Sequence, residues 1–296
     1  MTTELTPDPG LVLVDKPMGW TSRKAGAVVS KSIGIRKIGH LGTLDPFATG
    51  LLPLCVGRGT RLSHFLDQSI KGYEAELQLG VETDSADCDG AIVATQDVPS
   101  FTDEDLAQLA LRFVGEIKQV PPAHSAIRIG GQRAYKLARR GEAVEMPERT
   151  VFIHRMDVLR MDQNRLRIRV ECGAGTYIRS LGRDFAKSLG TVGHLVALRR
   201  TYVGALSVEF SAHPEQLTEG AVWSVGSLLQ RLGERLELDA SDALHVRQGK
   251  PLEQLAMLGG LSEGRYAALC NEEPVALLEF DAGRWRILRG LPPRAT

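Results

Sequence analysis

The chain has 296 residues, of which 43% are hydrophobic and 24% are charged, and its formal net charge at pH 7 is zero. This length allows one large domain, or one large and one small domain, around a substantial core. No apolar run is long enough for a transmembrane helix, and the first residues lack the apolar core of a signal peptide, so we expect a soluble cytoplasmic protein with no membrane contact.

The cysteines and histidines give no sign of metal or disulfide chemistry. The four cysteines are scattered without a C-x-x-C pair, and the seven histidines are dispersed without an H-E-x-x-H motif. Zinc sites and disulfide frameworks normally show such spacings. We therefore predict a protein that needs no metal and no cofactor.

The zero net charge hides an uneven distribution. Residues 16–37 carry six basic side chains and no acidic one, and residues 128–140 carry five and none, whereas residues 71–106 carry ten acidic side chains and one lysine. Two basic blocks can form a face that attracts phosphates. The alternative is an ordinary solvated surface, because charge blocks alone are weak evidence.

The N-terminal part predicts a strand followed by a capped helix. Residues 10–15 form an apolar run that is typical of a short buried strand. A turn over residues 16–22 follows, in which we expect Lys16 to support the next segment. Thr21 or Ser22 can cap a helix that continues to Ile33.

The stretch from residue 39 to residue 50 holds one carboxylate, Asp45, among small, apolar and turn-forming residues. Pro46 restricts the backbone of Asp45. Three glycines permit sharp turns or the close approach of a ligand: Gly39, Gly42 and Gly50. A carboxylate on a rigid turn suits a nucleophile or a general base, and the alternative is an Asp-Pro turn with a structural role alone.

The middle of the chain predicts a strand and a helix. Residues 73–80 alternate strictly, which predicts a strand with Tyr73 on its apolar face. Tyr73 is either a core aromatic or a ring that stacks on a ligand and offers a hydroxyl for proton transfer. Residues 101–117 predict a helix that starts with a capping box between Thr102 and Asp105.

The second half predicts a hairpin, a helix and a small C-terminal unit. Residues 150–158 and 166–172 indicate a hairpin, after which a glycine-rich turn leads into a helix. Arg179 lies near the start of that helix, where the helix dipole disfavours a cation, so we expect it to pair with a carboxylate. The alternative is a surface arginine. Acidic residues cluster at a boundary between residues 232 and 242, and short strands follow around the ranges 266–269, 275–280 and 285–288.

Several of these strings together resemble one protein family. The string from Gly39 to Gly50 resembles the catalytic motif of the TruB family of tRNA pseudouridine synthases, G-H-x-G-[TA]-L-D-P-x-A-[TS]-G, at all twelve positions. Other strings resemble further motifs of that family: D-K-P-x-G-x-T-S at 15–22, K-x-Y at 71–73, G-T-Y-I-R at 175–179 and L-R-R at 198–200. His124 departs from the family, which usually has tyrosine at that position.

The resemblance implies a fold and a division into domains. We expect an α+β fold in which residues 1–236 form a catalytic domain with a mixed, mainly antiparallel sheet and flanking helices. An insertion near residues 120–148, with a short basic helix at 134–141, is expected to clamp RNA. Residues 240–296 are expected to form a small β-rich, PUA-like, RNA-binding domain.

The resemblance also implies roles for individual residues. The expected catalytic residues are Asp45, Arg179 as the cation that lowers its pKa and keeps it ionised, and Tyr73 as the ring against the target base. His40 is expected beside the catalytic turn, where it either replaces a flipped base in the RNA stack or is a structural histidine, and Leu198 is expected to line the base pocket. The full set of expected RNA- or base-binding residues is His40, Tyr177, Leu198, Lys16, Arg199, Arg200, Lys136 and Arg139, with Arg199 and Arg200 placed at phosphates.

The implied reaction is the isomerisation of uridine 55 in the T-arm loop of tRNA to pseudouridine, carried out on a flipped-out base by a monomeric enzyme. Asp45 can add to C1′ of the ribose, add to the base or remove a ribose proton, and the sequence does not choose among these routes. Two alternatives remain open. The first is a non-catalytic RNA-binding or tRNA-folding protein on the same scaffold, and the second is a glycosidase or nucleosidase, which would need a second distinctive acid.

Overall fold

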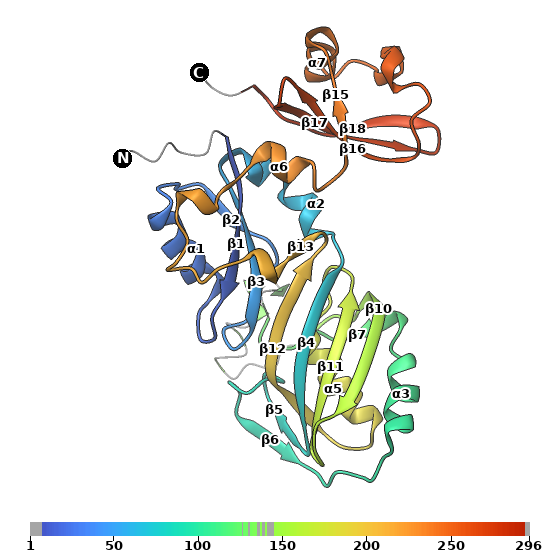
Figure 1. The fold of residues 1–296 in the computed structure, drawn as a ribbon. Helices are drawn as coiled ribbons and strands as arrows, with labels where there is room; N and C mark the ends of the chain where they lie inside the picture. Colours follow the sequence, from blue (N-terminus) through green and yellow to red (C-terminus); the bar gives the residue numbers. More distant parts are fainter. Residues whose placement is uncertain are drawn as a thin grey trace.

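The computed structural model describes residues 8–125, 127–129, 131–134, 137, 140 and 145–293. Much of the basic helix predicted at 134–141, including Lys136 and Arg139, lies outside the described residues. In Figure 1 a long twisted sheet fills the lower part of the molecule and a smaller sheet stands at its upper end.

The helices and strands alternate irregularly along the chain. In order they are β1 (Pro9–Lys16), α1 (Ser22–Ser32), β2 (Ile38–His40), β3 (Thr49–Val56), α2 (Ser63–Asp67), β4 (Lys71–Leu79), β5 (Val81–Thr83), β6 (Ile92–Thr95), α3 (Asp103–Leu111), β7 (Gly115–Gln119), β8 (Arg128–Ile129), β9 (Gln132–Arg133), β10 (Arg149–Arg160), β11 (Arg165–Cys172), α5 (Ile178–Ser188), β12 (Gly193–Val203), β13 (Leu206–Ser207), β14 (Trp223–Ser224), α6 (Val225–Leu229), β15 (Glu234–Glu237), α7 (Ala240–Arg247), β16 (Gly264–Cys270), β17 (Glu273–Asp281) and β18 (Arg284–Gly290). No helix among the described residues is long and apolar enough to cross a membrane.

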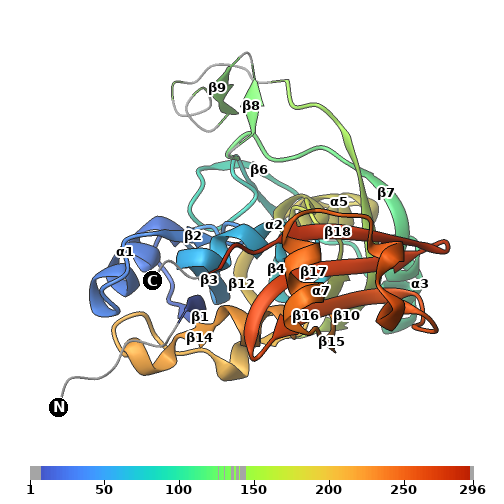
Figure 2. The ribbon, with the colours of Figure 1, turned by 90° about the horizontal axis from the view of Figure 1, so that it is seen from above.

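The large sheet confirms the predicted fold class. Within the described residues it has ten strands, with the main order β14-β1-β3-β12-β4-β11-β10-β7. The β12–β3 pair is parallel, whereas the neighbouring pairs along the rest of this path are antiparallel. Helices α3 and α5 pack against β10 and β12. The fold is therefore α+β with a mixed, mainly antiparallel sheet and flanking helices. Figure 2, viewed from above, shows β8 and β9 projecting away from this body.

Strand β4 shows why the alternating pattern predicted it correctly. Tyr73 and Leu77 point into the main core, where they are 9% and 0% exposed. Glu74, on the opposite face, meets Arg169 of β11 at 3.1 Å. One face of the strand is therefore buried by apolar contacts, and the other carries cross-strand charge pairs.

The helix predicted over residues 101–117 is only partly correct. The capping box between Thr102 and Asp105 is present, but α3 ends at Leu111. Gly115 then takes a φ of +98°, which a helix does not allow, and β7 begins there and pairs with β10. Ile117 is therefore a strand residue, and pairing with a distant strand outweighed the local helical spacing.

The predicted C-terminal strands are present as β16, β17 and β18, and the sheet that contains them begins within the boundary range of 232–242. The smaller sheet has the order β15-β16-β17-β18, and β15 pairs in parallel with β16. The sheet therefore begins at Glu234, inside the range of 1–236 that we expected for the first domain. Leu236 is the one buried residue of β15, so the strand carries almost no hydrophobic signal.

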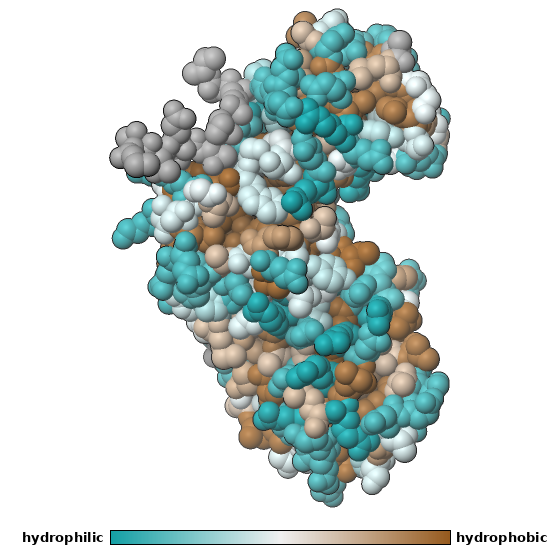
Figure 3. Space-filling model, in the orientation of Figure 1, coloured by the Kyte–Doolittle hydropathy of each residue, from teal (hydrophilic) through white to brown (hydrophobic). Residues whose placement is uncertain are grey.

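The C-terminal sheet shares a hydrophobic cluster with the large sheet. Leu269 and Leu277 of the small sheet pack in one cluster with Leu11 of β1, Leu51 of β3 and Leu228 of α6, and all five are 0% exposed. Figure 3 shows a recess between the two units on one side of the molecule. The hydrophobic cluster connects the two units. The apolar joint favours one fixed arrangement over a loose tether.

We expect Leu277→Ala to destabilise both units together. Truncating a fully buried leucine costs about 2–5 kcal/mol through lost burial and the cavity left behind. Denaturant unfolding followed by circular dichroism should show one weakened transition. Leu244→Ala is the matched control, because Leu244 is 56% exposed and lies in the same unit. Two separate transitions, with only the smaller one weakened, would show that the units unfold independently.

Candidate active site

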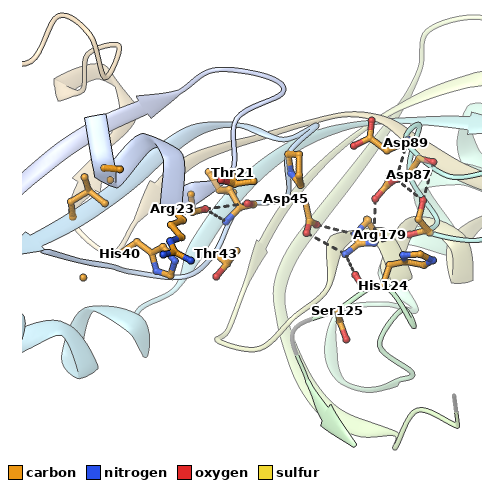
Figure 4. A pocket seen from close by; sticks show the side chains of 18 of the residues that line it. Thr21, Arg23, His40, Thr43, Asp45, Asp87, Asp89, His124, Ser125 and Arg179 are labelled. Atoms are coloured by element: carbon orange, nitrogen blue, oxygen red, sulfur yellow. Dashed lines mark hydrogen bonds and ion pairs between the residues drawn. The ribbon is translucent and has the colours of Figure 1, made fainter. Parts of the chain in front are cut away.

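A cavity of about 1220 Å³ opens beside the turn that carries Asp45. Helix α1, β2 and this turn form one wall, and the loop between β5 and β6 forms the other together with residues 124, 125 and 179 (Figure 4). The α1 side carries Arg23 and Arg36, whereas the opposite side carries Asp84 and Asp89. The cavity is thus basic along one edge and acidic along the other.

The Asp45 turn is held from beneath by the start of the chain. Lys16 is 0% exposed, and its Nζ donates hydrogen bonds to the carbonyl oxygens of Pro17, Trp20 and Pro46 at 3.0, 2.7 and 3.2 Å. Burial lowers the pKa of Lys16 to about 8, a shift that Asp45 opposes. Lys16 is therefore a support beneath the turn, as expected from the sequence, and its burial excludes direct contact with RNA in this structure.

Ser22 fixes the same turn from the first residue of α1. Its hydroxyl accepts a hydrogen bond from the Leu44 amide at 2.9 Å and lies 3.1 Å from the Leu44 carbonyl oxygen, to which it donates. Thr21, one residue earlier, caps α1 as predicted. The residue that precedes Asp45 is therefore pinned to the helix start, and the carboxylate is aimed by the backbone.

Arg179 pairs with a carboxylate, as its position near the start of α5 predicts. Its Nε lies 2.9 Å from Oδ2 of Asp45, and its second terminal nitrogen donates to Oδ1 at 3.3 Å. The guanidinium also donates to the carbonyl oxygens of Ser85 and His124, at 2.7 and 2.9 Å. Arg179 is 3% exposed, whereas the Asp45 side chain is 35% exposed. The carboxylate is therefore the member of the pair that faces the cavity.

The protonation of Asp45 is set by opposing effects. Burial raises the pKa of the Asp45 carboxyl above its ordinary value, the Arg179 guanidinium opposes this rise, and the Asp87 carboxylate adds to it. The sequence predicted a lowered pKa because of Arg179. The lowering effect is present, but burial outweighs it, so the net direction is upward.

Asp87 is the site residue that sequence reasoning missed. Its carboxylate lies 3.2 Å from Arg179, and it is 5% exposed. It also accepts hydrogen bonds from the Ser85 hydroxyl at 2.5 Å and from the Asp89 amide at 3.1 Å. The only signal in the sequence was its place among the ten acidic side chains of residues 71–106. Asp87 is too fully engaged to act as the free second acid that a glycosidase needs.

Comparison with known proteins places this site in a family. The model of the TruB family of pseudouridylate synthases, N-terminal domain, matches residues 30–178. The tRNA pseudouridine synthase B of Ralstonia pickettii (strain 12J) is 43% identical over 259 residues, which cover 84% of this chain and 81% of the relative. That of Francisella philomiragia is 43% identical over 283 residues, covering 93% and 92%.

The chain belongs to the TruB family. Its activity is that of a pseudouridine synthase. The fold agrees, since the crystal structure of a Cbf5-Nop10-Gar1 complex contains a chain that matches with a TM-score of 0.70 at 24% identity, covering 99% of this chain and 92% of that one.

Two of the predicted TruB-family residues lie under the site and do not line the cavity. Tyr73 on β4 and Leu198 on β12 are 9% and 6% exposed and belong to the main core. Burial raises the pKa of the Tyr73 phenol, Arg200 opposes this rise, and Asp45 adds to it. The roles of Tyr73 against the target base and of Leu198 in the base pocket stay predictions.

The two arginines of the L-R-R string have different environments. Arg199 is partly exposed and makes a two-pronged contact with Asp15, at 3.0 and 2.8 Å. Arg200, the next residue of β12, points to the opposite face and is 1% exposed. The prediction that Arg200 meets a phosphate is therefore wrong, because strand alternation turns it into the core.

The remaining predicted residues lie at the cavity rim or further away. His40 is exposed and lines the cavity beside Arg23. Tyr177 precedes α5, and its ring lies 5.1 Å from the Arg149 guanidinium rather than in the cavity lining. His124, which stands where the family usually has tyrosine, lines the cavity with its Nε2 3.9 Å from Oδ2 of Asp84.

Proposed function

We propose that the chain converts uridine 55, in the T-arm loop of tRNA, to pseudouridine, with Asp45 as the carboxylate that acts on the target nucleotide. The observation that carries the proposal is the Asp45–Arg179 pair, in which the carboxylate faces a large cavity while the guanidinium is buried. Relatives that share about two fifths of the sequence are named for tRNA, which supports tRNA as the substrate and RNA as the partner.

The reaction breaks the N-glycosidic bond of uridine, turns the uracil and joins its C5 to C1′ of the ribose. Nothing is oxidised or reduced, and no external group is consumed. Asp45 supplies the carboxylate, by addition to C1′, by addition to the base or by removal of a ribose proton. Arg179 opposes the effect of burial and so favours the ionised form of Asp45 for any of these steps.

The target base must leave the RNA stack before it reaches Asp45. The cavity has space for a nucleotide that has turned out of its loop. In this proposal His40, at the rim of the cavity, stacks where the base has left, and Tyr73, beneath the turn, supports the target ring or provides a route for the C5 proton. Arg23 on α1 and Arg36 between α1 and β2 offer charges for the adjoining phosphates.

Other parts of the chain extend the contact with tRNA in this proposal. Residues 120–148, with Lys136 and Arg139, clamp the RNA, and Arg199 contributes a partly exposed guanidinium. The C-terminal unit acts as a PUA-like RNA-binding domain. The enzyme works as a monomer in the cytoplasm and recognises RNA by shape, phosphates and loop bases.

An unmodified tRNA transcript tests this proposal directly. Incubation with the purified chain should give one pseudouridine, at position 55, when the product is mapped by chemical modification and primer extension. The isolated T-arm stem-loop should also be a substrate, and a transcript with cytidine at position 55 should give no product. Binding without product in a single-turnover assay would favour a non-catalytic RNA-binding protein. Product at another position would contradict the proposed specificity.

A further inference from the structure

Arg200 is a buried arginine that pairs with no carboxylate among the described residues. It is 1% exposed, on the core face of β12. Its partners on the neighbouring strands are Tyr73 of β4 and Gly50 of β3. Burying a charge is costly unless hydrogen bonds compensate, so the hydrogen bonds of this guanidinium indicate the role of Arg200.

The guanidinium bonds to both limbs of the Asp45 turn. Its Nε donates to the Leu51 carbonyl oxygen at 2.7 Å, on the strand that follows the turn. One terminal nitrogen donates to the carbonyl oxygens of Leu41 and Gly42, at 3.2 and 3.0 Å, on the limb that precedes it. The planar fork of one arginine therefore joins the entry and the exit of the loop that carries Asp45.

Two glycines of the catalytic stretch make room for Arg200. A Cβ on Gly42, whose φ is +63°, would lie 2.9 Å from a terminal nitrogen of the guanidinium. A Cβ on Gly50 would lie 2.3 Å from the backbone oxygen of Arg200. The sequence suggested that these glycines allow a ligand to approach. The structure shows that the neighbour they admit is the chain's own arginine.

Tyr73 lies directly across from Arg200. The two residues are paired in the register of β4 and β12, and both are buried in the core beneath the cavity. Arg200 also lowers the pKa of the Tyr73 phenol, against the larger effect of burial. One buried side chain therefore bonds to the Asp45 turn and faces Tyr73 on the neighbouring strand.

We propose that Arg200 is a positioning residue for this reaction: its guanidinium locks both limbs of the Asp45 turn into one arrangement opposite Tyr73 without touching the substrate. The inference rests on the proposed function. The charges that act on Asp45 are those of Arg179, Asp87 and Lys16. Arg200 therefore works through geometry, and its loss should misplace Asp45 relative to Tyr73 and leave the ionisation of Asp45 unchanged.

Arg200→Lys is the first test, because lysine keeps the charge but cannot bond to both limbs of the turn. The single-turnover rate on saturating tRNA should fall on the order of 100-fold, the scale of a small misplacement of a reacting group. The tRNA dissociation constant and the acid limb of the pH–rate profile should stay at their wild-type values. Arg167→Lys is the matched control, since Arg167 lies on β11 with a side chain that is 43% exposed.

Gly42→Ala tests the same contact while Arg200 stays in place. The added Cβ should displace the guanidinium and reduce the rate as Arg200→Lys does, and this variant decides the question if Arg200→Lys does not fold. Gly249→Ala is its control, because Gly249 has a φ of +68° and nothing within 4 Å of its Cβ position. The two glycines have similar φ angles, so the two variants should carry comparable backbone strain, and only in Gly42→Ala does the added Cβ lie 2.9 Å from the Arg200 guanidinium.

The outcomes separate this inference from the proposed function. An inactive wild type on tRNA would contradict the proposed function alone. With an active wild type, a wild-type rate in Arg200→Lys, or equal rates in Gly42→Ala and Gly249→Ala, would overturn the positioning role. So would a rate that recovers fully at higher tRNA concentration, which would make Arg200 a binding residue. Combining Arg200→Lys with Tyr73→Phe should give losses well below the product of the single losses, and multiplicative losses would also overturn it.

Discussion

Asp45→Asn is expected to abolish pseudouridine formation while tRNA binding and the fold persist. Asparagine has nearly the same shape, so the turn pinned by Ser22 and Lys16 should keep its backbone. It cannot add to the ribose or the base as a carboxylate does, and it cannot remove a proton. The single-turnover rate should fall more than about 10³-fold, the scale of losing a reacting group.

The stability of this variant separates loss of chemistry from loss of structure. The folded-state pKa of Asp45 is raised, so its contribution to stability is fully present below the unfolded-state pKa and is lost as pH rises through the folded-state pKa. At pH values above the unfolded-state pKa, this raised pKa therefore disfavours folding. Asn removes that cost, so the Tm of Asp45→Asn at neutral pH should equal or exceed that of the wild type.

The assay for Asp45→Asn needs two controls. The protein must be purified without contact with wild-type enzyme, because a trace of it gives apparent multiple turnover. The tRNA dissociation constant must be measured on the same sample. Substantial product from such a sample would show that Asp45 is not the reacting group, and a low Tm together with lost activity would assign it a structural role.

Local patterns predicted the parts of the fold whose causes are local. The strict alternation of β4, the hairpin of β10 and β11 and the cap of α1 by Thr21 depend on neighbouring residues alone. The end of α3 depends on β10, which is distant in the sequence and pairs with Ile117 as part of strand β7. The prediction failed there because strand pairing with β10 competes with the helix, and β10 is too distant in the sequence to enter a prediction from neighbouring residues.

The site residues also differ in whether local sequence could predict them. Asp45 and Arg179 were found because each lies in a distinctive string, and their contact was predicted from the two family motifs together with the charge of Arg179 near a helix start. Asp87 was missed because it stands among other acidic residues in a stretch that resembles a solvated turn. Its contact with Arg179 joins two segments that are far apart in the sequence. Arg200 was misassigned because the sequence of β12 shows two adjacent arginines, and only pairing with β3 and β4 tells which one is buried.

Arg179→Ala should lower the catalytic rate severely and move the acid limb of the pH–rate profile to higher pH. The guanidinium opposes the rise in the pKa of Asp45 that burial causes, so its removal lets that pKa rise further. A larger share of Asp45 is then protonated at a given pH below neutrality, and the active ionised form appears only at higher pH. Arg179→Lys should restore part of the rate, because a point charge lacks the two-pronged contact with Asp45.

A double-mutant cycle on single-turnover rates decides whether Arg179 and Asp45 act as one unit. Arg179 contacts Asp45, Asp87 and the carbonyl oxygens of Ser85 and His124, so its loss also frees the opposite wall of the cavity. The loss in the double variant should be far smaller than the product of the two single losses, because both changes act on the same reacting group. Residual activity must stay above detection for the comparison to hold.

The variant Lys187→Ala is the matched control, since Lys187 lies at the other end of α5 with a side chain that is 52% exposed. Multiplicative losses, or an acid limb that does not move in Arg179→Ala, would mean that Arg179 serves RNA binding or the fold instead of the ionisation of Asp45.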